Sequence, residues 1–120
     1  MANIMAVDDS TSLRQLLVRT LIAAGHRVVE AKDGVEALAV AKVNSVQLVI
    51  TDVNMPVMDG LTLVKRLREL PSFRNVPILV LTTEMDPAKK KIAKDAGATG
   101  WIVKPYEPDQ LIATIRKVLD

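Results

Sequence analysis

Residues 48–52, Leu-Val-Ile-Thr-Asp, are a short apolar run that ends in an aspartate. A run this short, without helical periodicity, is typical of a strand buried on both faces. Comparable runs recur along the chain, and amphipathic segments of helical period separate them. The strands expected are residues 4–7, 28–29, 48–50, 78–81 and 101–103. The pattern indicates alternating strands and helices.

The five helical segments are defined by their apolar spacing and by their end signals. Gly25 is expected to end the first helix and Asp33 to cap the second, while Pro71 closes the third and Asp86-Pro87 opens the fourth. The fourth helix is expected to turn Ile92, Ala93 and Ala96 inward. The residues at helical spacing in the other segments are, in chain order, Leu13, Leu16, Leu17, Thr20, Leu21, Ala24; Val35, Leu38, Ala41; Leu63, Val64, Leu67, Leu70; and Leu111, Ile112, Ile115, Val118, Leu119.

Five strands alternating with five helices imply a parallel sheet with helices on both faces. Right-handed crossovers leave two common strand orders, 2-1-3-4-5 and 3-2-1-4-5-6, and a five-stranded chain fits the first better. The prediction is therefore an α/β fold, a flavodoxin-like doubly wound three-layer sandwich. The length of 120 residues, with 49% hydrophobic and 25% charged residues, suits a single domain over residues 1–120.

Composition argues against several classes of function. The formal net charge is only +2, and one Phe, one Trp and one Tyr cannot build a base-stacking platform, so nucleic-acid binding is not expected. We expect neither a signal peptide nor membrane insertion, because the apolar runs are too short. The absence of cysteine removes disulfides and thiolate chemistry, which fits a cytoplasmic protein.

Three carboxylates are expected to meet at one edge of the sheet. In the order 2-1-3-4-5, strands 1 and 3 are neighbours at the topological switch point, where ligands bind. Asp8 and Asp9 follow strand 1, and Asp52 follows strand 3. Because the carboxylates repel one another, a cation should neutralise them. Oxygen ligands without histidine or cysteine favour Mg²⁺ or Mn²⁺.

Thr82 and Lys104 end strands 4 and 5, so both should overlook the same crevice. A hydroxyl and an ammonium beside a metal and a carboxylate make a phosphoryl site with Asp52 as nucleophile. Each signal also has an ordinary structural explanation. Asp9 could cap the next helix, Lys104-Pro105 could be a plain turn, and Thr82 could be a satisfied edge hydroxyl. The coincidence of all five at strand ends favours the phosphoryl site.

The residues of these strand ends resemble the receiver domains of bacterial response regulators. The resemblance runs over the whole chain, most closely to stand-alone receivers of the chemotaxis type and to phosphorelay intermediates without an output domain. The segments that carry it are Val7-Asp8-Asp9-Ser10, Thr51-Asp52-Val53-Asn54-Met55-Pro56-Val57-Met58-Asp59-Gly60, Leu81-Thr82 and Val103-Lys104-Pro105.

The resemblance implies a role for each matched residue. Asp52 would be the phosphoacceptor, with Asp9, Asp52 and the backbone carbonyl of Asn54 as direct Mg²⁺ ligands and Asp8 acting mainly through water. Thr82 would move its hydroxyl onto the phosphoryl group and Lys104 would pair with that group. The Lys104-Pro105 peptide bond would be cis, and Gly60 would permit a tight approach of the backbone before the third helix.

Two positions depart from the usual family pattern. Trp101 stands where most members have a Tyr, Phe or His that turns inward on activation. It could act as a switch with Thr82, or stay a static, partly buried strand residue. Thr83 replaces a usually smaller residue and could restrict access to the phosphoryl group. Together with Asn54 and Glu84, it is expected to tune the lifetime of the phosphorylated state.

The favoured hypothesis is a binding switch rather than an enzyme, self-catalysing only its own phosphotransfer and dephosphorylation. A histidine kinase or histidine phosphotransfer protein would donate the phosphoryl group. A downstream partner would bind the face made by helix 4, strand 5 and helix 5. A chemotaxis, motility or phosphorelay role and a monomeric state are expected.

The Lys89-Lys90-Lys91 run is either a solvated helix face or, with Lys94 and Arg116, a basic surface for an acidic partner.

The sequence argues against two other functions. A flavin carrier is disfavoured because Asp8-Asp9 would repel the flavin phosphate, and an aspartate-based phosphatase because Val53-Asn54 follows Asp52 without a second aspartate. A constitutive pseudo-receiver, or a receiver that is part of a longer regulator, stays open.

Overall fold

The computed structural model describes residues 1–83 and 87–120, and all five expected strands and helices are present in them. Their bounds are β1 (Asn3–Val7), α1 (Thr11–Ala23), β2 (Arg27–Ala31), α2 (Gly34–Val43), β3 (Leu48–Asp52), α3 (Gly60–Arg68), a short 3-10 helix (Pro71–Phe73), β4 (Ile78–Thr82), α4 (Pro87–Ala96), β5 (Gly100–Val103) and α5 (Pro108–Leu119). The expected cap Asp86 lies outside the described residues.

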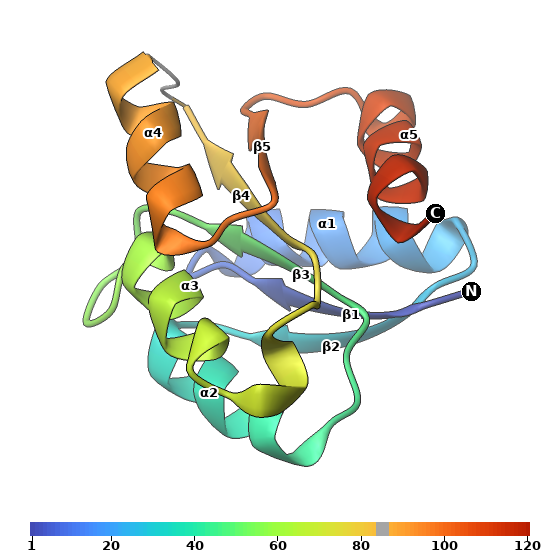
Figure 1. Ribbon diagram of the computed structural model, residues 1–120. Helices are drawn as coiled ribbons and strands as arrows, with labels where there is room; N and C mark the ends of the chain where they lie inside the picture. Colours follow the sequence, from blue (N-terminus) through green and yellow to red (C-terminus); the bar gives the residue numbers. More distant parts are fainter. Residues whose placement is uncertain (84–86) are drawn as a thin grey trace.

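The five strands form one parallel sheet in the order β2-β1-β3-β4-β5, which confirms the predicted topology. Helices α1 and α5 cover one face of the sheet, and α2, α3 and α4 cover the other (Figure 1). In the part of the chain that the structure describes, no helix is long and apolar enough to cross a membrane.

Alternate residues of each central strand enter two separate cores. In β1, Ile4 and Ala6 pack with α1 and α5, whereas Met5 and Val7 pack with α2 and α3. All four are fully buried. Since both faces are covered, neither tolerates a polar side chain, and the strand therefore appears in the sequence as a continuous apolar run.

Five residues of the helical patterns are exposed: Leu13, Leu16 and Ala24 of the first helical segment, Val35 in α2 and Ile92 in α4. Ile92 was expected to face inward, and that prediction was wrong. Leu13 and Leu16 border a cavity beside the connection from β5 to α5. Ile92 borders a second cavity beside α3. These side chains share the correct helix face but lie where no neighbouring element covers them.

The predicted helix ends at Gly25 and Asp33 are confirmed. Gly25 has φ +93°, a left-handed conformation that a side chain disfavours, and its N–H donates to the carbonyl of Ile22 at 2.9 Å. The Asp33 carboxylate accepts the N–H of Glu36 at 2.8 Å. These ends fix the short connections that return the chain to the sheet.

His26 fixes the start of β1 at the edge of the sheet opposite the carboxylate cluster. Its Nδ1 accepts the backbone N–H of Ala2 at 3.1 Å. Burial lowers the pKa of His26, and the positive charges of the N-terminal amine and Arg116 lower it further. The neutral ring is therefore favoured in the folded protein, and protonation of Nδ1 would remove the acceptor.

We expect a His26→Asn variant to lose less stability on acidification than the wild type. A lowered folded-state pKa means that this contribution is present above about pH 6.5 and is lost as pH falls below it. Asn offers an oxygen acceptor that does not titrate. Urea denaturation from about pH 7.5 to about pH 5 measures the difference. Equal loss in both proteins would contradict the assignment.

Candidate functional site

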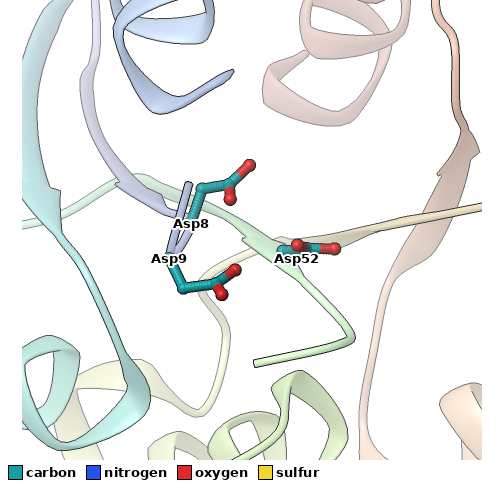
Figure 2. A group of neighbouring side chains, drawn as sticks. All are labelled: Asp8, Asp9 and Asp52. Carbon is teal, nitrogen blue, oxygen red and sulfur yellow. The ribbon is translucent and has the colours of Figure 1, made fainter. Parts of the chain in front are cut away.

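Asp8, Asp9 and Asp52 meet at the carboxyl ends of β1 and β3. One carboxylate oxygen from each lies within 4.8 Å of the others. Figure 2 shows the side chains of Asp8 and Asp9 extending from the end of β1 toward Asp52. Val7 is paired with Thr51, so the next residues of the two strands are brought side by side. The register of two strands therefore creates the cluster.

Backbone groups hold the two buried carboxylates in place. The Asp8 side chain is 3% exposed and accepts the N–H of Ser10 at 2.9 Å. The Asp52 side chain is 10% exposed and accepts the N–H of Val53 at 2.9 Å. Asp9, in contrast, is exposed. The cluster thus has a buried floor and one carboxylate at its open side.

Lys104 places an ammonium against this floor. Its Nζ lies 3.0 Å from Asp52 Oδ1 and 4.0 Å from Asp8 Oδ2, and its side chain is 19% exposed. The Lys104 backbone N–H donates to the carbonyl of Thr82 at 2.8 Å, which continues the pairing of β5 with β4. The Lys104-Pro105 peptide bond is cis, the isomer that the family resemblance implies.

The electrostatics of the cluster favour a cation. Burial raises the pKa of Asp8, and the charges of Asp52 and Asp9 raise it further, whereas the N–H of Ser10 and the ammonium of Lys104 lower it. Among the described residues, Lys104 is the cation within ion-pair distance of this cluster of three carboxylates, so negative charge is in excess. A purely oxygen donor set with excess negative charge fits Mg²⁺ or Mn²⁺.

Thr82, Thr83 and Asn54 line one cavity beside the cluster. The cavity has a volume of about 330 Å³ and continues to apolar residues of α3 and α4. Thr82 is 6% exposed at the end of β4, whereas Thr83 and Asn54 are exposed. The structure thus places a hydroxyl and an amide at the rim of the acidic cluster. Glu84, also expected there, lies outside the described residues.

Trp101 lies in β5, three residues before Lys104. It pairs with Val80 across the sheet and is partly buried against the core shared by α2, α3 and α4. The ammonium of Lys90 lies 5.2 Å from the centre of its ring, within range of a cation–π contact. The indole is therefore half-covered and contacted from α4.

The expected basic surface is smaller than the sequence suggested. Arg116 borders a cavity with Arg19 between α1 and α5, not beside α4, so its assignment to this face was wrong. The side of α5 on which an arginine falls depends on helix rotation, which the spacing did not fix. Lys91 forms an ion pair with Asp95 at 3.6 Å, which reduces the positive charge further.

Sequence reasoning missed Arg14. Its Nη1 donates to the backbone carbonyl of Asp8 at 2.7 Å, and its Nε donates to Glu30 Oε1 at 3.1 Å. An arginine within an amphipathic helix carries no signal of its own. Only the distance between α1 and the end of β1 shows that it contacts the site.

Gly60 allows α3 to begin against the end of β3. A Cβ at this position would lie 2.1 Å from the carbonyl oxygen of Asp52, and the Gly60 N–H donates to the carbonyl of Val53 at 2.8 Å. The obstacle is backbone, which cannot give way as a side chain does. The close approach expected at Gly60 is present.

Comparison with known proteins identifies the class to which this fold and site correspond. The family model described as response regulator receiver domain matches residues 4–116. The chain belongs to the response regulator receiver domain family. Members of this family are, broadly, signalling switches and not enzymes.

Within this family the chain is similar to chemotaxis proteins. The chemotaxis protein CheY homolog of Campylobacter jejuni is 41% identical over 118 residues, which is 97% of this chain and 91% of that protein. CheY1 of Helicobacter pylori is 40% identical over 97% of this chain and 95% of its own length. The structure of CheY4 of Vibrio cholerae is 50% identical, with a TM-score of 0.96 over 99% of both chains.

Gly60→Ala should lower the free energy of unfolding by about 1–3 kcal/mol, because the new methyl group forces the ends of β3 and α3 apart. Gly100→Ala is the matched control, since its Cβ would meet only a side-chain atom of Leu79 at 3.3 Å. Urea denaturation of both variants measures the difference. A cost no greater for Gly60→Ala than for Gly100→Ala would refute the close-approach argument.

Proposed function

We propose that the chain is a phosphorylation-activated switch in which Asp52 accepts a phosphoryl group from a phosphohistidine. The observation that carries this proposal is the 3.0 Å approach of Lys104 Nζ to Asp52 Oδ1 inside a group of three carboxylates. A carboxylate with a fixed cation on one side and a divalent cation site on the other is suited to receive a phosphoryl group.

Asp9 and Asp52 would hold Mg²⁺, or Mn²⁺, directly together with the backbone carbonyl of Asn54, and Asp8 would act mainly through water. A bound divalent cation supplies charge neutralisation at the phosphoryl oxygens. The burial of Asp52 and the exposure of Asp9 support a site between them, since an ion needs both a fixed ligand and an open side to which a phosphoryl group can come.

In the transfer, a carboxylate oxygen of Asp52 forms a bond to phosphorus while the bond from phosphorus to the imidazole nitrogen breaks. The electron pair stays on the imidazole of the donor, a histidine kinase or histidine phosphotransfer protein. Lys104 would pair with a phosphoryl oxygen, and the Thr82 hydroxyl would donate to another. Water would later hydrolyse the acyl phosphate, with Asn54, Thr83 and Glu84 tuning the rate. The chain would thus catalyse only its own phosphorylation and dephosphorylation.

A downstream partner would bind the face made by α4, β5 and α5. Phosphorylation would bias an existing equilibrium of these elements, with Thr82 and Trp101 as the switch pair. Lys90 contacts the Trp101 ring, and exposed Val103 in β5 adds apolar area to this face. The proposed partner is acidic, and the proposed role is in chemotaxis, motility or a phosphorelay. The receiver itself is proposed to be monomeric, single-domain and cytoplasmic.

Incubation with acetyl phosphate and Mg²⁺ should add one phosphoryl group to the wild type and none to Asp52→Asn. Intact-mass spectrometry measures the gain. Asn keeps the shape of the side chain but lacks the nucleophilic carboxylate. Asp59→Asn is a matched control, because Asp59 caps α3 outside the cluster and should leave labelling intact. Equal labelling of wild type and Asp52→Asn would refute the proposal.

Trp101 gives a second, optical prediction, since it is the only tryptophan. If the indole moves away from Lys90 on activation, beryllofluoride with Mg²⁺ should change its fluorescence emission in the wild type. Asp52→Asn should show no change. An unaltered wild-type spectrum would remove Trp101 from the switch and leave it as a static strand residue, without affecting phosphorylation at Asp52.

A further inference from the structure

The connection from β1 to α1 is only three residues long, and two of them are the acidic pair. The Asp8 N–H continues the sheet by donating to the carbonyl of Ala31 at 3.1 Å, and the Asp8 carboxylate accepts the N–H of Ser10 at 2.9 Å. Asp8 is thus held through its N–H and its side chain. Its carbonyl belongs to the peptide group that joins it to Asp9.

That carbonyl is bound by Arg14. The Nη1 of Arg14 donates to it at 2.7 Å, and the arginine side chain is 14% exposed. Rotation of this peptide plane would move the Asp9 Cα and its exposed carboxylate relative to Asp52. Metal–ligand distances in protein sites lie within about 0.2 Å of their preferred values. The direction of the Asp8 carbonyl therefore governs how well Asp9 can serve as a ligand.

Arg14 is itself oriented by Glu30. The Nε of Arg14 donates to Glu30 Oε1 at 3.1 Å, so two N–H groups of one planar guanidinium are engaged at once. Glu30 lies on the edge strand β2, where it is paired with Ala6 of β1. The contact links β2, α1 and the end of β1. A lysine could not reproduce it, because its single ammonium lacks the planar fork.

We propose that Arg14, oriented by Glu30, is a positioning residue for Asp9 and thereby sets the affinity of the acidic cluster for its divalent cation. Arg14 acts through the Asp8–Asp9 peptide group and does not contact the ion. This inference rests on the proposed function, since it assumes that the cluster binds a metal. Outer contacts of this kind change metal affinity by about 10-fold to 100-fold.

The test measures Mn²⁺ binding directly, by loss of the electron paramagnetic resonance signal of the free ion on titration. Arg14→Lys, which keeps the charge, should raise the Kd about 10-fold. Arg19→Lys, an exposed arginine on the same helix, should leave the Kd unchanged. Glu30→Gln keeps an acceptor for Nε and should stay closer to the wild type than Glu30→Leu does. A wild-type Kd in Arg14→Lys would overturn the proposal.

A second background separates positioning from a general loss of structure. If Arg14 acts through Asp9, Arg14→Lys should change the Kd far less in an Asp9→Asn protein than in the wild type, because coupled residues are non-additive. The same fold-change in both backgrounds would overturn the proposal. Thermal unfolding, followed by circular dichroism, ensures that every titration is made on folded protein.

The titrations distinguish a wrong metal site from a wrong positioning role for Arg14. If the wild type binds no Mn²⁺, the metal site of the proposed function is wrong and this inference falls with it. If the wild type binds Mn²⁺, Asp9→Asn weakens binding and Arg14→Lys does not, the metal site stands and only the positioning role is refuted.

Discussion

β1 and β3 lie side by side in the sheet although α1, β2 and α2 separate them in sequence, and the register pairs Val7 with Thr51. This pairing forces Asp8 and Asp52 together where both strands end. Mutual repulsion of the carboxylates follows directly, and so does the need for a compensating charge. Lys104, from the end of β5, is the compensation that the chain itself supplies. The other groups of the site are arranged around these mutually repelling carboxylates.

A site of this kind works against the stability of the fold that holds it. Asp8 and Asp52 are buried carboxylates in a sheet whose other central residues are almost all apolar, and burial raises the pKa of Asp8. The backbone N–H groups of Ser10 and Val53 donate to these carboxylates and offset part of their desolvation. The cores on the two faces of the sheet stay free of charge. The buried carboxylates are confined to one edge of the molecule, where a cation can enter.

Much of this arrangement could be predicted from the sequence, because it depends on the order of elements. Apolar runs located the strands, and the ends of those strands located Asp8, Asp52 and Lys104. Helix faces were less predictable. Periodicity tells which residues share a face but not how far a neighbouring element extends over it, and so Ile92 was wrongly expected to face inward. Contacts that depend on the reach of a long side chain, as for Arg14, left no trace in the pattern.

The exposure of Leu13 and Leu16 has a consequence for how partners and phosphorylation influence each other. Both residues border a cavity that also contains Asp8 and Lys104. A molecule that binds in this cavity would contact Asp8 and Lys104, so its binding and the proposed phosphorylation of Asp52 would involve the same side chains. If Asp52 is phosphorylated as proposed, the two equilibria are reciprocal: the factor by which phosphorylation changes the affinity of a molecule in this cavity is the factor by which that molecule changes the equilibrium of phosphorylation. A ligand bound beside Leu13 and Leu16 would then report on the state of Asp52 and alter it at the same time.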